Sequence, residues 1–545
     1  MNNILSTLKI QRKLCLSVAL VVIFLWSVVT ISWDKLLLSG GSSTVFQIFK
    51  ALFNVNLSKE ILTIGLEATL ITLVYASAGM SIALVIALIF GTLASGILFE
   101  NNIFGIFIST FSRSFLGLIR AIHELIWALL FVSSIGLSSY AAIFALAIPY
   151  GGILGRILAD ILTDAPKEPI LSLRASGANR FQCFIYGYLP MVFPNMVSYA
   201  LYRFECSLRS SAIMSFIGIA GIGYQIQLSL SDLKYDEVWT FLFFIVGLVI
   251  LVDYWSSRLR NSINTPKQFR KKFNFVTFSR FIFLILLICP WFYIVIIDDA
   301  SLKNLFTASN LDFAKMFFMN MFGVGNDTPA FLDSERWKNA ILLTYDTVKM
   351  GVLAIGITAV TSLLTVLFAS KNIANGELSS NKNFLGKPLF YFTRAIYIFI
   401  RSVPELVWAM IIVFILKPGI VPGAIALALH NIGILGKLWA EVIEDMDARP
   451  IRNLRLSGAS YIQMLFYGVI PSVFPQFLSY LFYRAEVIIR TTIVVGLVGA
   501  GGLGQEFKLS LSYFDYTNLT LLLICYVVIV LIVDSLSSLS RRIVR

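Results

Sequence analysis

A polar segment of 18 residues occurs twice in this chain, and long apolar runs flank both copies. The copies cover residues 173–190 (LRASGANRFQCFIYGYLP) and 454–471 (LRLSGASYIQMLFYGVIP), which are 281 positions apart. Each begins Leu-Arg-x-Ser-Gly-Ala and has a proline 13 residues after its glycine. A glycine at this point permits a tight turn between two short helices. We therefore expect two matching surfaces that lie outside the membrane.

The flanking runs predict the fold class. The chain is 58% hydrophobic and 13% charged, whereas a soluble domain has about 25% charged residues. A chain this apolar is expected to be an all-α polytopic membrane protein, because helices satisfy their own backbone hydrogen bonds in lipid. The alternating pattern of a membrane barrel is absent. The net charge of +13 follows from basic residues in short loops, which are typical of the cytoplasmic side, and does not indicate nucleic acid.

The repeat predicts the domain organisation. At the constant offset of 281, residues from position 120 to the end of each half match without a gap. We predict about 12 transmembrane helices in two parallel six-helix repeats, covering residues 1–257 and 281–545 and joined by a basic cytoplasmic linker, 258–280. Identical residues at this offset include Arg120 and Arg401, Glu124 and Glu405, Trp127 and Trp408, and Asp253 and Asp534.

Hydropathy gives the individual membrane spans. Lys9, Arg12 and Lys13 precede the first apolar run, which is too long for a signal-peptide core, so we expect an uncleaved first span with a cytoplasmic N-terminus. The expected spans of the first half, and the first of the second half, are 14–33, 61–98, 115–135, 141–162, 197–226, 238–256 and 281–297.

The twin polar segments resemble the cytoplasmic loop of binding-protein-dependent ABC importer permeases. In that family a glycine is followed 13 residues later by an apolar–proline pair, and the loop forms a helix seated in a cleft of an ATPase subunit. This chain departs from the pattern at Leu171 and Arg452, where the family has an acidic residue, and at Gly187 and Gly468, where it has an apolar one. The resemblance implies ATPase docking through Leu173, Arg174, Gly177, Ala178, Pro190, Leu454, Arg455, Gly458, Ala459 and Pro471.

A second stretch is similar to the phosphonate-type permeases of these importers. It reads RSVPELVWA at 401–409, and RAIHELIWA occupies the same place at 120–128. The resemblance implies two fused permease units of the type I importer fold in a bacterial inner membrane. It also implies two copies of a cytoplasmic ATPase that bind ATP and Mg²⁺, an outer solute-binding protein, and alternating access. The implied cargo is a phosphonate or a related phosphorus oxyanion.

Charged residues inside apolar segments are the third signal. Arg203, Glu205 and Arg209 recur as Arg484, Glu486 and Arg490. Charges within a membrane are costly and usually face a partner or a watery path. Two interpretations stay open: structural ion pairs near the cytoplasmic interface, or arginines that attract an anion in a translocation pathway. Glu124 and Glu405 are expected to brace helix packing.

The glycine-rich segments 218–223 and 499–504 also recur. Gly499, Gly502 and Gly504 fit a dinucleotide-binding template, but that site needs a preceding strand, and here the glycines end an apolar helix. We expect close helix packing or a flexible outer gate. The candidate gate residues are Gly218, Gly221, Gly223, Gly499, Gly502 and Gly504.

Several functions lack their motifs. No GxxxxGK[ST] occurs, so the chain has no P-loop and we expect no cofactor on it. His123 and His430 are the only histidines, which argues against a metal centre, and clustered catalytic groups of an enzyme are not evident. A permease for another small solute and an ion-coupled secondary transporter remain the alternatives.

Overall fold

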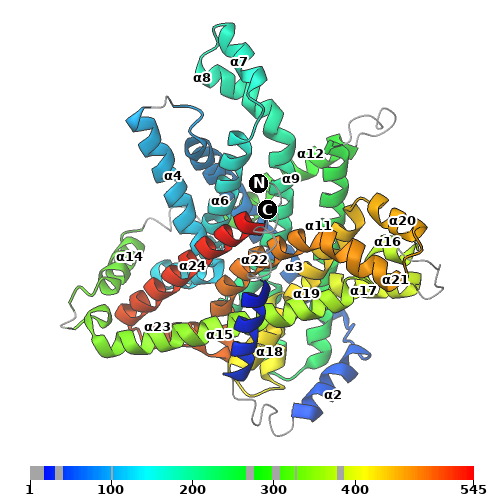
Figure 1. Cartoon of the computed structure of the whole chain (residues 1–545). Coiled ribbons are helices and arrows are strands. Elements are labelled where there is room, and N and C mark those ends of the chain that lie inside the picture. Colours follow the sequence, from blue (N-terminus) through cyan, green and yellow to red (C-terminus); the bar gives the residue numbers. More distant parts are fainter. Residues whose placement is uncertain are drawn as a thin grey trace. The chain divides into compact units, whose positions relative to one another are not determined.

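The computed structural model describes residues 17–30, 41–99, 102–264, 275–297, 307–325, 328–376 and 386–544. Its described elements are helices (Figure 1), as the composition predicts. The central residues of the predicted linker, 265–274, lie outside this part of the chain. The chain forms two compact units, one of residues 48–319 and the other of residues 1–47 with 320–545.

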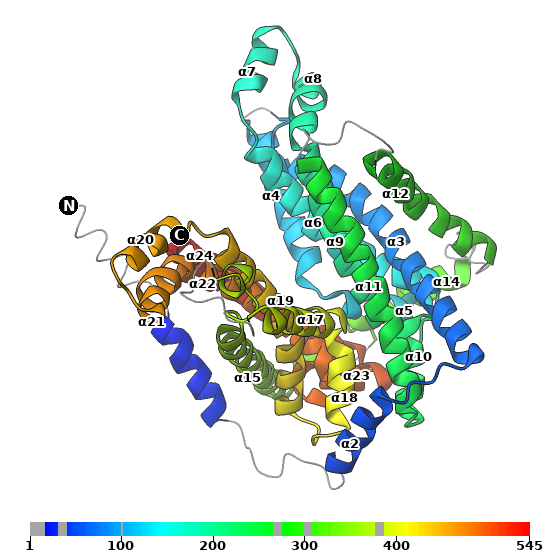
Figure 2. The ribbon, with the colours of Figure 1, turned by 90° about the vertical axis from the view of Figure 1, so that its right-hand side faces the viewer.

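The unit of residues 48–319 is built on two long apolar helices. Helices α3 (Lys59–Ser95) and α6 (Ser139–Thr163) pack closely because small residues face each other: a Cβ on Gly91 would lie 2.7 Å from the Gly155 carbonyl oxygen. Figure 2 shows α3, α6, α9 and α11 side by side. The other elements around this pair are α4 (Ile103–Ala121), α5 (Glu124–Ile135), α9 (Leu189–Met214), η2 (Ser215–Ile217), α10 (Ile222–Ser231), α11 (Tyr235–Asn264), α12 (Phe275–Phe292) and η3 (Tyr293–Ile297).

The second unit repeats this order. Helix α19 (Ile420–Asp445) is its most buried long helix and packs against α15 (Ser334–Thr365) and α22 (Ile470–Val495). The remaining elements are the helix Ser17–Val29, η4 (Ala330–Leu332), α16 (Lys371–Ala374), α17 (Gly386–Ser402), α18 (Glu405–Val413), η6 (Gly496–Ala500), α23 (Gly502–Ser512) and α24 (Tyr516–Val544). Helices α2 (Gly41–Leu52) and α14 (Ala308–Met321) are each divided between the two units.

Eight described helices are long and apolar enough to cross a membrane, and eleven spans result if each of three bent helix pairs counts as one. The apolar helix Ser17–Val29 is shorter than a span in its described part. This agrees with a polytopic fold of about 12 helices. The predicted bounds of the third span, 115–135, were wrong, because α4 ends at Ala121 and a new helix begins at Glu124.

The first helix of each sequence half packs in the compact unit of the other half. Phe24 of Ser17–Val29 lies over Gly356 of α15, and Trp26 meets Tyr345 edge-on at 5.6 Å. In the other unit, the Trp291 indole of α12 donates to Ser81 of α3 at 3.1 Å. The division predicted at 257 and 281 describes the sequence repeat, whereas packing exchanges these two helices.

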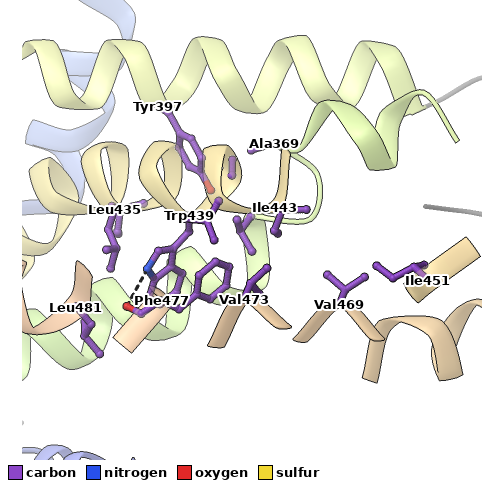
Figure 3. Close-up of a cluster of buried hydrophobic side chains, with 14 of the residues drawn as sticks. Ala369, Tyr397, Leu435, Trp439, Ile443, Ile451, Val469, Val473, Phe477 and Leu481 are labelled. Atoms are coloured by element: carbon purple, nitrogen blue, oxygen red, sulfur yellow. Dashed lines mark hydrogen bonds between the residues drawn. The ribbon is translucent and has the colours of Figure 1, made fainter. Parts of the chain in front are cut away.

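The core of the second unit continues from the membrane helices to the polar segment. The Trp439 and Phe477 rings are stacked with centroids 4.5 Å apart, and the Trp439 indole donates to the Phe477 carbonyl oxygen at 3.2 Å (Figure 3). Ile451, three residues before the polar segment, and Val469 within it belong to the same buried cluster. The polar segment is therefore fixed to the helices that follow and precede it.

Candidate docking helices and buried charge networks

The first polar segment forms two short helices joined at a glycine. Helix α7 (Glu168–Ala175) ends where Gly177 adopts φ +86°, and the Ala178 N–H donates to the Leu173 carbonyl oxygen at 3.1 Å. This hydrogen bond and the left-handed residue form a Schellman-type end, which favours glycine. Asn179 and Gln182 then form a capping box that starts α8 (Arg180–Gln182), followed by η1 (Cys183–Tyr188). The predicted turn between two helices is confirmed.

The second segment has the same construction. Helix α20 (Arg449–Leu456) ends at Gly458 with φ +83°, and Ser460 and Gln463 form the capping box of α21 (Tyr461–Gln463), which leads into η5 (Met464–Val469). Before α20, the Arg449 side chain donates to Asp447 and lowers the pKa of that exposed carboxyl. Both helix pairs project beyond the ends of the long helices in the views of Figures 1 and 2.

Gly187 and Gly468, where the sequence departs from the family pattern, have a packing role. A Cβ on Gly187 would lie 2.5 Å from Ile170 Cδ1, and one on Gly468 would lie 3.0 Å from Leu454 Cδ1. The two arms of each helix pair approach so closely that a larger side chain would force them apart. Both departures therefore fit the geometry of this particular helix pair.

Each helix pair, together with the π-helical segment that follows it (η1 or η5), exposes apolar side chains at matched positions. Tyr186 is 73% exposed and its repeat partner Tyr467 is 77% exposed. The other exposed apolar side chains at equivalent positions are Phe181 and Ile462, and Ile185 and Phe466. Exposed apolar patches of this kind mark interaction sites.

The ten predicted docking residues lie in or next to these helix pairs. Leu173 and Leu454 are half-buried under the pair, whereas Arg174 and Arg455 are exposed near the ends of α7 and α20. Pro190 and Pro471 stand in the first turn of α9 and α22, directly after the π-helical segments η1 and η5. Gly177, Ala178, Gly458 and Ala459 form the turns. The exposed Tyr186 and Tyr467 were not among the predicted residues.

Four charged residues of the second repeat form one network: Glu486, Arg490, Asp534 and Arg541. Arg490 contacts Glu486 on its own helix and Asp534 of α24 at 3.1 Å. Arg541 approaches Glu486 at 3.4 Å and donates to Ser537 at 2.6 Å. The network thus joins α22 to α24 through two carboxylates and two guanidinium groups.

The first repeat has the corresponding ion pair. Arg260 of α11, the equivalent of Arg541, contacts Glu205 of α9 at 2.8 Å and donates to Ser256 at 2.7 Å. Arg209 donates to the Cys206 sulfur at 3.4 Å. Sequence reasoning missed Arg260 and Arg541, although their offset of 281 was visible in the sequence.

The remaining pair of candidate arginines differs between the repeats. The Arg203 guanidinium donates to the Tyr199 hydroxyl at 2.7 Å and lies 5.6 Å from the Tyr202 ring centre. Arg484 instead donates to the Asn431 side chain, with Nε 3.0 Å from the amide oxygen. Arg203 is half-buried and Arg484 is buried. The arginine positions are repeated, whereas these two hydrogen-bond acceptors differ.

Glu124 and Glu405 each follow a break between two helices. Glu124 accepts from Ser210 of α9 at 2.5 Å, and its other oxygen lies 3.6 Å from Nε2 of His123. Glu405 lies 3.5 Å from Nε2 of His430 on α19. The contact between Glu405 and His430 connects residues that the sequence did not associate.

The candidate gate glycines lie at bends. The α9–α10 pair bends by 47° across Gly218 and Gly221, and the α22–α23 pair bends by 62°. Gly499 and Gly502 have positive φ, while Gly223 and Gly504 permit close approach: a Cβ on Gly504 would lie 2.1 Å from the Ile493 carbonyl oxygen. Bend and close packing therefore occur at the same repeated segment.

Groups of three or more potential metal ligands were not found among the described residues.

Comparison with known proteins gives the family. A model of the binding-protein-dependent transport system inner membrane component matches residues 87–264 and 373–545, two segments that end 281 positions apart. The chain is 26% identical to the phosphate-import permease protein of Mycolicibacterium smegmatis over 78% of this chain and 76% of that protein.

Two further relatives are shorter matches. The phosphite transport system permease protein of Stutzerimonas stutzeri is 34% identical over 39% of this chain and 73% of its own length. A putative cryptic phosphonate transport system permease protein of Escherichia coli K12 is 36% identical over 22% of this chain and 97% of its own length. With two matched segments on helical repeats, the chain belongs to the family of binding-protein-dependent transport system inner membrane components, as a multi-pass protein of the bacterial inner membrane.

Proposed function

We propose that this chain is the transmembrane component of an ATP-driven importer, with ATPase subunits docked on the helix pairs α7–α8 and α20–α21. The observation that carries the proposal is the exposed apolar face that both pairs present, with Tyr186 and Tyr467 at equivalent positions. Aromatic side chains that fill pockets of a partner contribute strongly to binding. Two equivalent faces suit two copies of one ATPase, which would bind ATP and Mg²⁺.

The proposed cargo is a phosphorus oxyanion such as phosphate, phosphite or a phosphonate. The names of the relatives support this class. An outer solute-binding protein would deliver the anion, as the family description indicates. Arg203 and Arg484 are candidate pathway cations; the Arg203 guanidinium donates to the Tyr199 hydroxyl and the Arg484 guanidinium to the Asn431 side chain.

The proposed mechanism is alternating access. The helix pair α20–α21 is connected to the membrane helices by one buried cluster, which contains Ile451, Val469 and the stacked Trp439 and Phe477. Movement of an ATPase subunit against α20–α21 would therefore be transmitted to α19 and α22. The bends at Gly218–Gly221 and Gly499–Gly502 provide joints at which the ends of the helices could reorient.

The docking step is tested by co-purifying the chain with its ATPase subunits. Tyr186→Asp combined with Tyr467→Asp should lower the amount of bound ATPase at least tenfold, because a charge replaces an aromatic anchor. The matched control is Tyr186→Phe with Tyr467→Phe, which keeps both rings and should retain the ATPase. Equal ATPase recovery from both double variants, at equal membrane content, would refute docking on these faces.

The cargo is tested by uptake of radiolabelled phosphate into cells that express the complete transporter. Competition by unlabelled phosphite and methylphosphonate would place the cargo in the proposed class. Uptake that an ionophore abolishes while cellular ATP is maintained would favour an ion-coupled transporter, and competition by an unrelated solute alone would favour a different cargo.

A further inference from the structure

The two histidines of the chain lie against equivalent glutamates from different positions in the repeat. His123 precedes Glu124 directly, and the equivalent of His123 in the second half is Pro404. His430 lies on α19, and its equivalent in the first half is Pro149. The repeats have thus exchanged histidine and proline. In both units, however, an imidazole Nε2 lies 3.5–3.6 Å from the carboxylate that begins the helix after the break.

Hydrogen bonding determines which ring nitrogen of His123 carries a proton. The Leu125 backbone N–H donates to Nδ1 of His123 at 3.2 Å. Since an N–H can only donate, Nδ1 must present its lone pair. The neutral ring therefore has its proton on Nε2, which points at Glu124. In this tautomer the donor on Nε2 faces an acceptor oxygen of Glu124.

The same reasoning gives the opposite result for His430. Its Nδ1 lies 2.9 Å from the Val403 carbonyl oxygen, which can only accept, so Nδ1 carries a proton. A neutral His430 then has a lone pair on Nε2, and that lone pair faces an oxygen of Glu405. Two acceptors facing each other in a buried site are unfavourable. His430 is 7% exposed and Glu405 is 8% exposed, so bulk water screens the contact poorly.

We infer that Glu405 and His430 form a proton-binding site that holds one proton more than Glu124 and His123. The proton converts the contact into either an imidazolium–carboxylate pair or an imidazole–carboxylic acid pair. Each form has a donor between Nε2 and the carboxyl oxygen. The ligand of this site is thus a proton, and the site exists in one repeat only.

The proton site connects the elements around the sharpest bend of the second unit. Helices α17 and α18 meet at 89°, with Val403 and Pro404 at the break. His430 binds the Val403 carbonyl through Nδ1 and faces the first residue of α18 through Nε2. With the proton present, α19 is therefore tied to both sides of the break. Loss of the proton at higher pH places two acceptors together and loosens the start of α18.

The other charged groups near this site come from the elements that pack on α19. Helix α17 contributes the buried Arg401, and α22 contributes Arg484, which binds Asn431 beside His430. In α15, Asp346 and Lys349 form an ion pair with each other, with Nζ and Oδ1 2.9 Å apart. η6 has no charged residue, and Lys371 of α16 lies at the far end of α19, where its N–H donates to Glu444. Glu405 contributes the carboxylate that contacts Nε2 of His430, at 3.5 Å.

The protonation states can be read directly, because the chain contains two histidines. The full-length protein, purified without a histidine tag and labelled with ¹⁵N-histidine, yields signals from two imidazole rings. His123→Gln and His430→Gln assign them. We expect a neutral His123 with Nε2 protonated. For His430 we expect either two protonated nitrogens, or a protonated Nδ1 together with an infrared carboxylic acid band that Glu405→Gln removes.

A matched exchange provides the control. In the double variant Pro404→His with His430→Pro, the second repeat takes the arrangement of the first, and the histidine introduced at 404 should show the neutral state of His123. The proposal is overturned if wild-type His430 is neutral with its proton on Nε2. It is also overturned if His430 is neutral with Nδ1 protonated and no carboxylic acid band depends on Glu405.

The effect on the bend is measured by hydrogen–deuterium exchange in one sample. Segment 403–413 is compared with its equivalent 122–132, so the intrinsic pH dependence of exchange cancels in the ratio. We expect this ratio to rise at least threefold as pH increases through the titration of the pair. Glu405→Gln should abolish the rise, because its amide can donate to a neutral Nε2. A flat ratio in the wild type would refute the proposed loosening.

Discussion

Removing both carboxylates around Arg490 should destabilise the second unit far more than removing either one. Arg490 is 12% exposed, and it contacts Glu486, which is 6% exposed, and Asp534, which is 13% exposed. In Glu486→Gln or Asp534→Asn, one carboxylate still neutralises the guanidinium and the new amide oxygen can accept a hydrogen bond. Each single variant should therefore cost about 1 kcal/mol.

The double variant Glu486→Gln with Asp534→Asn takes away both opposite charges that contact Arg490. A buried charge without an ionic partner costs about 3–5 kcal/mol. The two substitutions should therefore be non-additive, with a coupling of about 1–3 kcal/mol, which lies in the range for residues of one network. The exposed Asp447→Asn, which removes the partner of Arg449, is the control and should leave the unfolding midpoint unchanged.

The assay is thermal unfolding of the purified chain in detergent, performed in parallel with anion uptake. A structural network predicts a lower unfolding midpoint in the double variant and a loss of uptake in proportion to the folded protein that is lost. A pathway role for Arg490 predicts an unchanged midpoint and altered uptake per folded molecule. Additive midpoint shifts would refute the reasoning that Arg490 depends on its two carboxylates jointly.

Two further variants test the docking helices and the core beneath them. Gly458→Val should destabilise the turn by about 1–2 kcal/mol, because φ is +83° and the valine would strain the backbone. We expect faster proteolysis at this turn, whereas Gly458→Asn should resist cleavage because asparagine tolerates this conformation. Equal cleavage rates in the two variants would contradict the proposed strain. Trp439→Ala removes the ring stacked on Phe477 and its hydrogen bond. It should destabilise the second unit by about 3–5 kcal/mol, seen as a lower unfolding midpoint. An unchanged midpoint would show that this contact between α19 and α22 does not stabilise the unit.

The sequence repeat was sufficient to predict the helical fold and the two polar helix pairs. Glycine, capping residue and proline occur at fixed spacing, and each acts locally, so Gly177 and Gly458 adopt the expected left-handed conformation. Hydropathy did not locate the break after Ala121, because residues 115–135 are mostly apolar and contain no proline. There the His123 side chain acts as the cap of α5.

Contacts between distant residues were harder to predict. The charged triplets were evident, but the arginines that approach Glu205 and Glu486 lie 55 residues further along the chain. Their identification requires the packing of α11 on α9 and of α24 on α22. The contact between His430 and Glu405 was equally hidden, because the repeats place their histidines at different positions.

The exchange of first helices explains why the sequence repeat and the compact units differ. The gapless match from position 120 onward does not determine where the first apolar helix of each half packs. In the structure, α12 belongs to the unit of residues 48–319, and the helix Ser17–Val29 belongs to the other unit. Each unit thus buries its α3 or α15 surface with a helix from the opposite half of the sequence. A half-length chain of this design would lack one helix of its own core, and it would complete that core only by exchanging helices with a second copy.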